Sequence, residues 1–202
     1  PTTVVLDVAH GHSKRNLECC AELVRRGFKV VSGNIVTPKA VEDCLKIGVN
    51  TFRVGLGSGS VCSTRMVTGV GAPQALAISI LRNRFSNITI ISDGGHRTTG
   101  DIIKALALGA DMVMLGGVLS GTDEVPEKGK IEYRGMASVN AQIDRGKQEF
   151  IEEGVSFPVT SKGSVKLVLE KIRNAIKLAC YYTGSRNLLE LRTCEKILIT
   201  QA

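Results

Sequence analysis

The sequence predicts a parallel α/β fold. Five short apolar segments, each about five residues long, are separated by segments whose apolar residues recur at helical spacing. The pattern repeats at intervals of roughly 20 to 30 residues, as successive βα units do. The core segments lack the alternation of apolar and polar residues that is typical of antiparallel strands with one exposed face. These observations favour one parallel sheet with helices packed against it.

The first βα unit begins with the apolar run at residues 3–9, which we expect to be a strand buried on both faces of the sheet. Ser13 is a suitable N-cap for the helix that follows, and Gly27 is a suitable stop. The buried face of this helix is predicted from the helical spacing of Leu17, Cys20, Ala21 and Val24.

The remaining units follow the same order. Further strands are expected at residues 28–32, 51–54, 88–92 and 111–115. The helices between them are expected at 38–47, 75–84 and 101–108, the first opening with Pro38 at a position that favours proline.

The last third of the chain has a different pattern. Residues 122–133 are polar and predict a hairpin that turns near Lys128 and Gly129. The charged segment 142–153 has little apolar periodicity and is expected to be a mobile flap. A long amphipathic helix is predicted after Ser164, ending at Gly184, followed by a solvated tail with one apolar strand at 197–199. We expect a single domain over residues 1–202, with 118–160 as an insertion within it.

Composition narrows the class of protein. A chain of 202 residues with 43% hydrophobic content can form one sizeable core. No run approaches the roughly 18 apolar residues of a membrane span, and the first residues lack the basic region of a signal peptide. The six cysteines include no CxxC pair. These features predict a cytoplasmic protein with reduced thiols and no membrane partner.

The net charge of +7 does not predict nucleic-acid binding. The 26 lysines and arginines are dispersed, and only five phenylalanines and three tyrosines are available to stack on bases. A solvated basic surface explains the charge.

The glycine-rich segment 55–74 is the strongest candidate for a functional loop. It follows the expected strand at 51–54, and parallel α/β folds carry their chemistry at the carboxyl ends of strands. Its glycines let backbone groups converge on a phosphate or a cation. Loop amides and Arg65 can favour the thiolate of Cys62, which would then be a nucleophile. The alternative is a buried, inert cysteine in a structural turn.

Two further loops can bind a phosphorylated ligand. Asp93 can accept hydrogen bonds from ribose hydroxyls, while Gly94 and Gly95 let backbone N–H groups approach a phosphate. A second glycine pair, Gly116 and Gly117, follows the next strand, and Ser60 can complete the cradle. Taken singly, each glycine pair is also compatible with a tight turn.

Residues 57–65, Gly-Ser-Gly-Ser-Val-Cys-Ser-Thr-Arg, and 68–74, Thr-Gly-Val-Gly-Ala-Pro-Gln, strongly resemble the catalytic loop of the GMP reductase and IMP dehydrogenase family. The resemblance implies a (β/α)8 TIM barrel of which this chain has only the C-terminal five βα units. Chains of the family have additional strands ahead of the segment that matches residues 4–9. We therefore expect either a fragment that pairs with a missing N-terminal half or an assembly that covers the open sheet in another way.

The resemblance also implies site residues. Cys62 would bond to C2 of a purine nucleotide, and Thr64 with Glu153 would transfer protons. The nucleotide would be bound by Ser60, Asp93, Gly94, Gly95, Gly116, Gly117, Gly135, Met136 and Ala137. NADPH would be bound by Asp7, Ala9, His10 and Met136, and Asn34 is a further candidate for ligand contact. Potassium would lie at Gly57, Gly59, Cys62 and Arg65.

Three features favour the reductase reaction, in which GMP is converted to IMP and ammonia through a thioimidate on Cys62. They are the Cys-Ser-Thr-Arg loop, the short flap between Met136 and Gly154, and the lack in that flap of the Arg-Tyr pair with which dehydrogenases activate water. Oxidation of IMP to XMP with NAD and catalytically silent binding of a purine nucleotide are the alternatives. Members of the family form tetramers, so we also expect a homo-oligomer.

Overall fold

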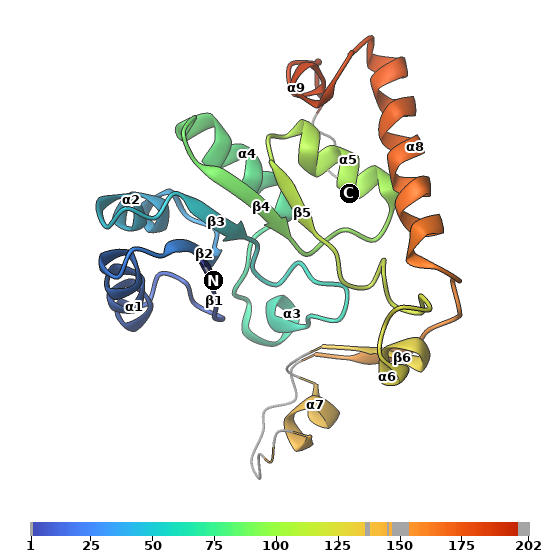
Figure 1. Cartoon of the computed structure of the whole chain (residues 1–202), viewed down its shortest axis with the longest axis horizontal. Coiled ribbons are helices and arrows are strands. Elements are labelled where there is room, and N and C mark those ends of the chain that lie inside the picture. The colour runs from blue at the N-terminus through green and yellow to red at the C-terminus, as the bar shows by residue number, and fades with distance from the viewer. Residues whose placement is uncertain (1, 136–137, 145, 147–153, 198–202) are drawn as a thin grey trace.

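The computed structural model of the chain describes residues 2–135, 138–144, 146 and 154–197 (Figure 1). It contains a five-stranded parallel sheet with the strand order β1-β2-β3-β4-β5. The strands are β1 (Thr3–Asp7), β2 (Lys29–Ile35), β3 (Thr51–Val54), β4 (Thr89–Asp93) and β5 (Met112–Met114). The predicted parallel α/β fold is therefore confirmed, and the sheet is open.

A helix follows each of the first four strands, which confirms the predicted βα order (Figure 1). These helices are α1 (Lys14–Arg25), α2 (Pro38–Lys46), α4 (Gln74–Arg84) and α5 (Thr99–Ala107), and a short helix, α3 (Thr64–Thr68), lies in the glycine-rich loop. The predicted caps form: the Ser13 side chain accepts a hydrogen bond from Asn16 N at 3.3 Å, and Pro38 opens α2.

The core lies between the sheet and these helices. Phe52 and Val54 from β3 and Ile90 from β4 are fully buried, and they pack with Ile78 and Leu81 of α4. Burying such large side chains contributes roughly 1.5 to 3 kcal/mol each before conformational entropy is counted. The central strands are thus the stable part that carries the loops of the site.

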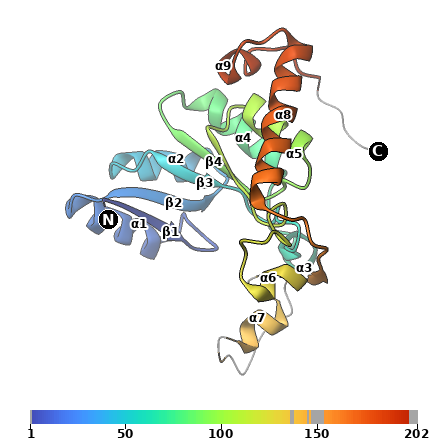
Figure 2. The ribbon, with the colours of Figure 1, turned by 45° about the vertical axis from the view of Figure 1, so that its right-hand side comes forward.

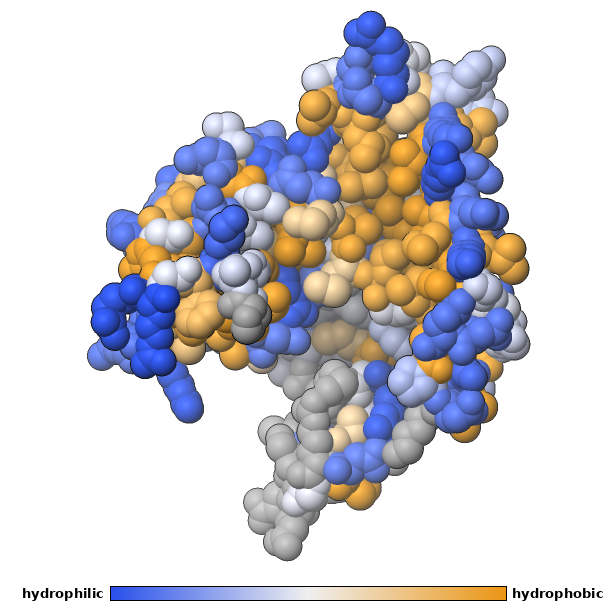
Figure 3. Space-filling view, viewed as in Figure 1, coloured by the Kyte–Doolittle hydropathy of each residue, from blue (hydrophilic) through white to orange (hydrophobic). Residues whose placement is uncertain are grey.

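The edge strand β1 differs from the prediction, whereas no burial was predicted for the other edge strand, β5. Val5 of β1 is 53% exposed, so the expectation that β1 is buried on both faces is wrong. Among the described residues, β1 pairs only with β2 and β5 only with β4, so each leaves one edge and one face uncovered. Met112 and Met114 of β5 are also exposed, and Figure 3 shows apolar side chains gathered over β5, α5 and α8.

The polar segment after β5 does not form the predicted hairpin. Residues 127–131 form α6 (Glu127–Ile131), which contains the expected turn, and β6 (Glu132–Arg134) pairs with the distant β7 (Ser156–Pro158). The pairing is antiparallel and sets Tyr133 opposite Phe157, with ring centroids 5.7 Å apart. The local turn pattern was misleading because the partner strand lies beyond the flap, where a local pattern does not reveal it.

The rest of the chain is helical where it is described. Helix α7 (Val139–Ile143) overlaps the start of the predicted flap, of which residues 145 and 147–153 lie outside the described part. The long helix α8 (Val165–Thr183) begins after Ser164 and ends at Gly184, as predicted, and it lies beside α5 (Figure 2). Helix α9 (Leu188–Leu191) follows. Ile197 is exposed outside any strand, and 198–199 are not described. No described helix is both long and apolar enough to cross a bilayer.

Candidate active site

The cysteine loop is fixed at both ends to the neighbouring strands. Near its start, the Ser58 hydroxyl donates a hydrogen bond to the backbone carbonyl of Asp93 at 3.0 Å. At its end, the Gln74 side-chain amide donates to Val54 O at 2.7 Å and to Ser92 Oγ at 2.8 Å. The loop therefore lies over the carboxyl ends of β3 and β4, where the sequence predicts the site.

Cys62 is exposed, so the expectation of burial in the alternative interpretation is wrong. Its Sγ lies 3.1 Å from the hydroxyl oxygen of Thr64, the first residue of α3. Two other cysteines, Cys20 and Cys44, are buried, and burial raises the pKa of the Cys44 thiol to about 11. Cys62 thus combines exposure with a neighbouring hydroxyl, which is compatible with the predicted role of a nucleophile.

The C-terminal end of the segment between β6 and β7 is attached to the residues around Cys62. The Gly154 amide donates to Ser63 Oγ at 2.6 Å, and the Val155 amide donates to Val61 O at 3.0 Å. Gly135 N donates to Val155 O at 3.1 Å. Glu153, Met136 and Ala137 lie outside the described residues, so their roles stay predictions.

An arginine that the sequence analysis did not select joins two of the predicted site residues. Arg53 of β3 forms ion pairs of 2.7 Å with Asp93 and with Asp7, and Asn34 donates to the same Asp93 oxygen at 2.8 Å. Burial lowers the pKa of Arg53, but the carboxylates of Asp93 and Asp7 outweigh this and raise it. The available signal was an arginine between the apolar residues Phe52 and Val54 of the strand, because arginine is rarely buried unless it is paired.

The predicted phosphate cradle contains a tyrosine that the sequence analysis also missed. The Tyr133 hydroxyl lies against Gly116, where a Cβ would collide with it. A Cβ on Gly117 would lie 3.1 Å from the Tyr133 ring and 3.2 Å from Ser60 Oγ. Burial raises the pKa of Tyr133, although its bonds to the Gly117 backbone and Ser60 lower it. The sequence analysis placed Tyr133 in a local hairpin. Its position in the cradle depends instead on the pairing of β6 with β7, which a local pattern does not reveal.

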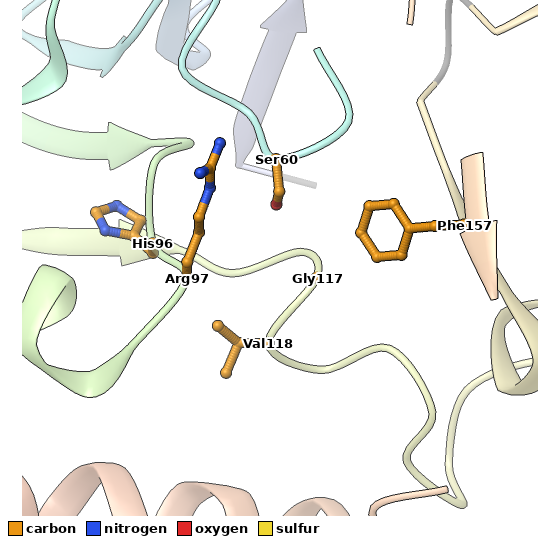
Figure 4. Close-up of a pocket in the computed structure, with 6 residues that line it drawn as sticks. All are labelled: Ser60, His96, Arg97, Gly117, Val118 and Phe157. Carbon is orange, nitrogen blue, oxygen red and sulfur yellow. The ribbon is translucent and has the colours of Figure 1, made fainter. Parts of the chain in front are cut away.

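The structure brings the three predicted loops together around this cradle. Gly94 and Gly95 have positive φ of 87° and 83°, and a Cβ on Gly94 would lie 2.9 Å from Gly59 N. A pocket of about 410 Å³ lies beside them (Figure 4). It is lined by Ser60, His96, Arg97, Gly117, Val118 and Phe157.

The predicted cofactor residues lie at the carboxyl end of β1. Asp7, Ala9 and His10 are exposed. Through Arg53, the carboxylate of Asp7 is coupled to Asp93. The His10 ring contacts the His12 ring edge-on with centroids 6.4 Å apart.

The predicted cation site consists of loop carbonyls. Gly57 has a positive φ of 74°, and the Arg65 side chain packs against both Gly57 and Gly71. The Gly59 carbonyl accepts a hydrogen bond from Cys62 N at 3.1 Å, which leaves its second lone pair for a cation. In the described part of the chain, no group of three or more His, Cys, Asp or Glu residues can hold a metal ion.

Two known proteins match most of this chain in sequence. An inosine-5′-monophosphate dehydrogenase from Aquifex aeolicus is 39% identical over 216 residues, and one from Nitrosopumilus maritimus is 38% identical over 213 residues. These matches cover 96% and 94% of this chain but only 44% of each relative. The chain thus spans less than half the length of these relatives.

A solved structure with the same fold is that of a cysteine-to-alanine variant of Trypanosoma brucei GMP reductase in complex with guanosine 5′-monophosphate. The TM-score is 0.84 at 32% identity, and the match covers 95% of this chain and 43% of that one. The five-stranded sheet therefore corresponds to part of a TIM barrel, as predicted. The family model of the IMP dehydrogenase / GMP reductase domain matches residues 2–202. The chain belongs to the IMP dehydrogenase / GMP reductase family.

Proposed function

We propose that this chain carries the nucleotide site and the nucleophile of a GMP reductase, an oxidoreductase that converts GMP to IMP and ammonia. The observation that carries the proposal is the exposed Cys62 thiol 3.1 Å from the Thr64 hydroxyl, in a loop over the strand ends. The structure of GMP reductase with GMP bound, at 32% identity, supports the same substrate.

In this reaction the Cys62 thiolate adds to C2 of GMP, and the bond between C2 and its exocyclic amino nitrogen breaks to release ammonia. The product is a thioimidate between Cys62 and the purine. NADPH, when bound, supplies a hydride to C2, after which the C–S bond breaks and IMP leaves with the thiolate restored. The Thr64 hydroxyl is close enough to Cys62 to move a proton to the departing amine.

Thr64 needs a second group because its hydroxyl is a weak acid. We assign that role to Glu153, which would complete a Cys-Thr-Glu relay. Support comes from the residue that follows it, since Gly154 N donates a hydrogen bond to Ser63 between Cys62 and Thr64. The segment 118–160, which contains Glu153, would be an insertion within the single domain.

Nucleotide binding follows from the cradle. Ser60, the glycine loops and the Tyr133 hydroxyl would hold the 5′-phosphate. Asp93 Oδ2 is used by Arg53 and Asn34, whereas Oδ1 has no hydrogen-bond partner among the described residues, so Oδ1 can accept a ribose hydroxyl. Gly135 would lie beside the base with Met136 and Ala137.

The remaining assignments concern cofactor and cation. Asp7, Ala9 and His10, with Met136, would bind NADPH, because Asp7 keeps an exposed carboxylate despite its pair with Arg53. The carbonyls of Gly57, Gly59 and Cys62 would hold potassium with Arg65 packed behind them, since converging carbonyls can replace a hydration shell. We also propose a homo-oligomer, which a monomeric mass in solution would contradict.

A second candidate is IMP dehydrogenase, which oxidises IMP to XMP with NAD. The names of the Aquifex and Nitrosopumilus relatives favour it. The two activities share Cys62 and differ in how the thioimidate is resolved.

The test uses GMP with NADPH, and separately IMP with NAD, in potassium buffer, with Cys62→Ala as the control and GMP binding followed by calorimetry. GMP-dependent oxidation of NADPH that is lost in the variant supports the reductase. Formation of NADH from IMP instead makes the chain a dehydrogenase. GMP binding without turnover in either assay contradicts both enzymes and leaves a nucleotide-binding protein.

A further inference from the structure

The pocket beside the glycine loops is lined by a positively charged side chain that does not belong to the phosphate cradle described above. Of the described residues that line the pocket of about 410 Å³ next to Ser60 and Gly117, Arg97 is the only lysine, arginine, aspartate or glutamate. In Figure 4 its side chain extends from the end of the β4 loop in the direction of Ser60. The phosphate of a nucleoside monophosphate carries a charge near −2, so a guanidinium at this place can bind it.

The backbone of Arg97 is fixed while its side chain is available. Arg97 N donates to Asp101 Oδ2 at 3.2 Å, next to the capping box that Thr98 and Asp101 form at the start of α5. Within the described residues the guanidinium makes no hydrogen bond or ion pair.

Neighbouring carboxylates are already engaged. Asp101 accepts from Thr98 and pairs with Lys104 at 3.1 Å. Asp93 is held by Arg53 and Asn34. Among the described residues, no carboxylate lines the pocket or the adjoining one of about 560 Å³, where Arg97 is joined by Lys162 and Lys171. A group of cationic side chains around a pocket raises the local concentration of anions.

The other groups of the cradle are neutral. Ser60, Tyr133 and the glycine amides donate hydrogen bonds but carry no charge, and the Lys162 ammonium is turned to the carbonyls of Gly117 and Val118 at 3.0 and 3.1 Å. We propose that Arg97 binds the 5′-phosphate of the nucleotide directly and thereby determines the preference of the site for a nucleotide over a nucleoside. This inference rests on the proposed function.

The test compares the affinities of GMP and guanosine, measured by calorimetry on the whole chain, for the wild type, Arg97→Gln and Arg97→Lys. The matched control is Arg173→Gln, which removes one exposed arginine of α8 outside both pockets. We expect Arg97→Gln to weaken GMP binding about tenfold, as one lost charge-assisted hydrogen bond at an exposed site does, and to leave guanosine unchanged. Arg97→Lys should bind GMP more tightly than Arg97→Gln but less tightly than wild type, and the control should bind GMP as the wild type does.

Ionic strength gives an independent readout. The ratio of the GMP affinities of wild type and Arg97→Gln should shrink when salt is raised from about 0.05 M to about 0.5 M, because screening weakens the exposed charge pair. A GMP affinity of Arg97→Gln within twofold of wild type would overturn the inference while leaving the proposed function standing. Equal weakening of GMP and guanosine would also overturn it, since this indicates a general defect of the site. Wild type that binds no GMP would overturn both.

Discussion

The Arg53 guanidinium lies 2.7 Å from the Asp93 carboxylate, and this pair joins the carboxyl ends of β3 and β4 beneath the candidate nucleotide site. Arg53 is only 12% exposed, and its second ion pair, with Asp7, extends the network to β1. One side chain therefore holds both the predicted ribose acceptor and the predicted cofactor acceptor. Its loss should affect stability and binding together.

We predict that Arg53→Gln lowers the free energy of unfolding by about 3 kcal/mol, because it leaves Asp93 partly buried without its cation. Urea denaturation measures the change. Arg84→Gln is the matched control, since Arg84 is 60% exposed and pairs with Glu42 at the surface, where a pair contributes less than about 1 kcal/mol. Equal effects of the two substitutions would contradict the structural role of Arg53.

The contact between Gly116 and Tyr133 predicts a compensating pair of substitutions. Gly116→Ala should destabilise the protein by about 1 to 3 kcal/mol, because the new Cβ collides with the Tyr133 hydroxyl. Removing that hydroxyl leaves the ring carbon at 3.4 Å, an ordinary contact, so Tyr133→Phe should relieve most of this cost in the double variant. Thermal denaturation of the single and double variants measures the coupling.

A control for the glycine substitution is Gly100→Ala, where the nearest atom to a Cβ is Thr98 Oγ1 at 3.6 Å. It should change stability by less than about 0.5 kcal/mol. Strictly additive effects of Gly116→Ala and Tyr133→Phe would show that the two residues do not touch.

Lys162 is predicted to position the Gly116–Gly117 loop without touching the nucleotide. Its ammonium donates to the carbonyls of Gly117 and Val118, and burial lowers its pKa. Lys162→Met should lower the free energy of unfolding by about 1 kcal/mol through the two lost hydrogen bonds. It should weaken the binding of GMP and of guanosine 5′-diphosphate by the same factor. Calorimetry with both ligands checks this, with Lys166→Met on α8 as the control. A loss of affinity for only one of the two ligands would instead contradict a purely positional role.

Cys44 makes stability fall in alkaline solution. Burial raises its pKa from an ordinary 9.0 to about 11, with Cys20 and Asp43 adding to the shift and a bond to Ser32 opposing it. The folded protein thus favours the neutral thiol. The stability from this group is complete below about pH 9 and is lost as pH rises toward 11. The free energy of unfolding measured across this pH range should fall less steeply for Cys44→Ala than for wild type. Parallel pH profiles would show that the Cys44 thiol does not cause the loss of stability.

Much of the fold and part of the site could be predicted from local patterns. The helix at 14–25 is defined by Ser13 and by apolar residues at helical spacing, and α8 by its own period and Gly184. Such signals lie within a few residues of one another, so they predict a helix without knowledge of the rest of the molecule. The motif at 57–65 likewise located the loop that presents Cys62 and Thr64.

Other features depended on contacts between distant segments. The sequence by itself determined the order of βα units, the helix caps and the loop that carries Cys62. Only the tertiary structure decided that Tyr133 pairs with the strand at 156–158 and enters the cradle, that Arg53 joins Asp7 to Asp93, and that Val5 of the edge strand is exposed. The physical reason is that strand pairing, burial and ion pairing depend on which surfaces meet, and a local pattern specifies only what each surface offers.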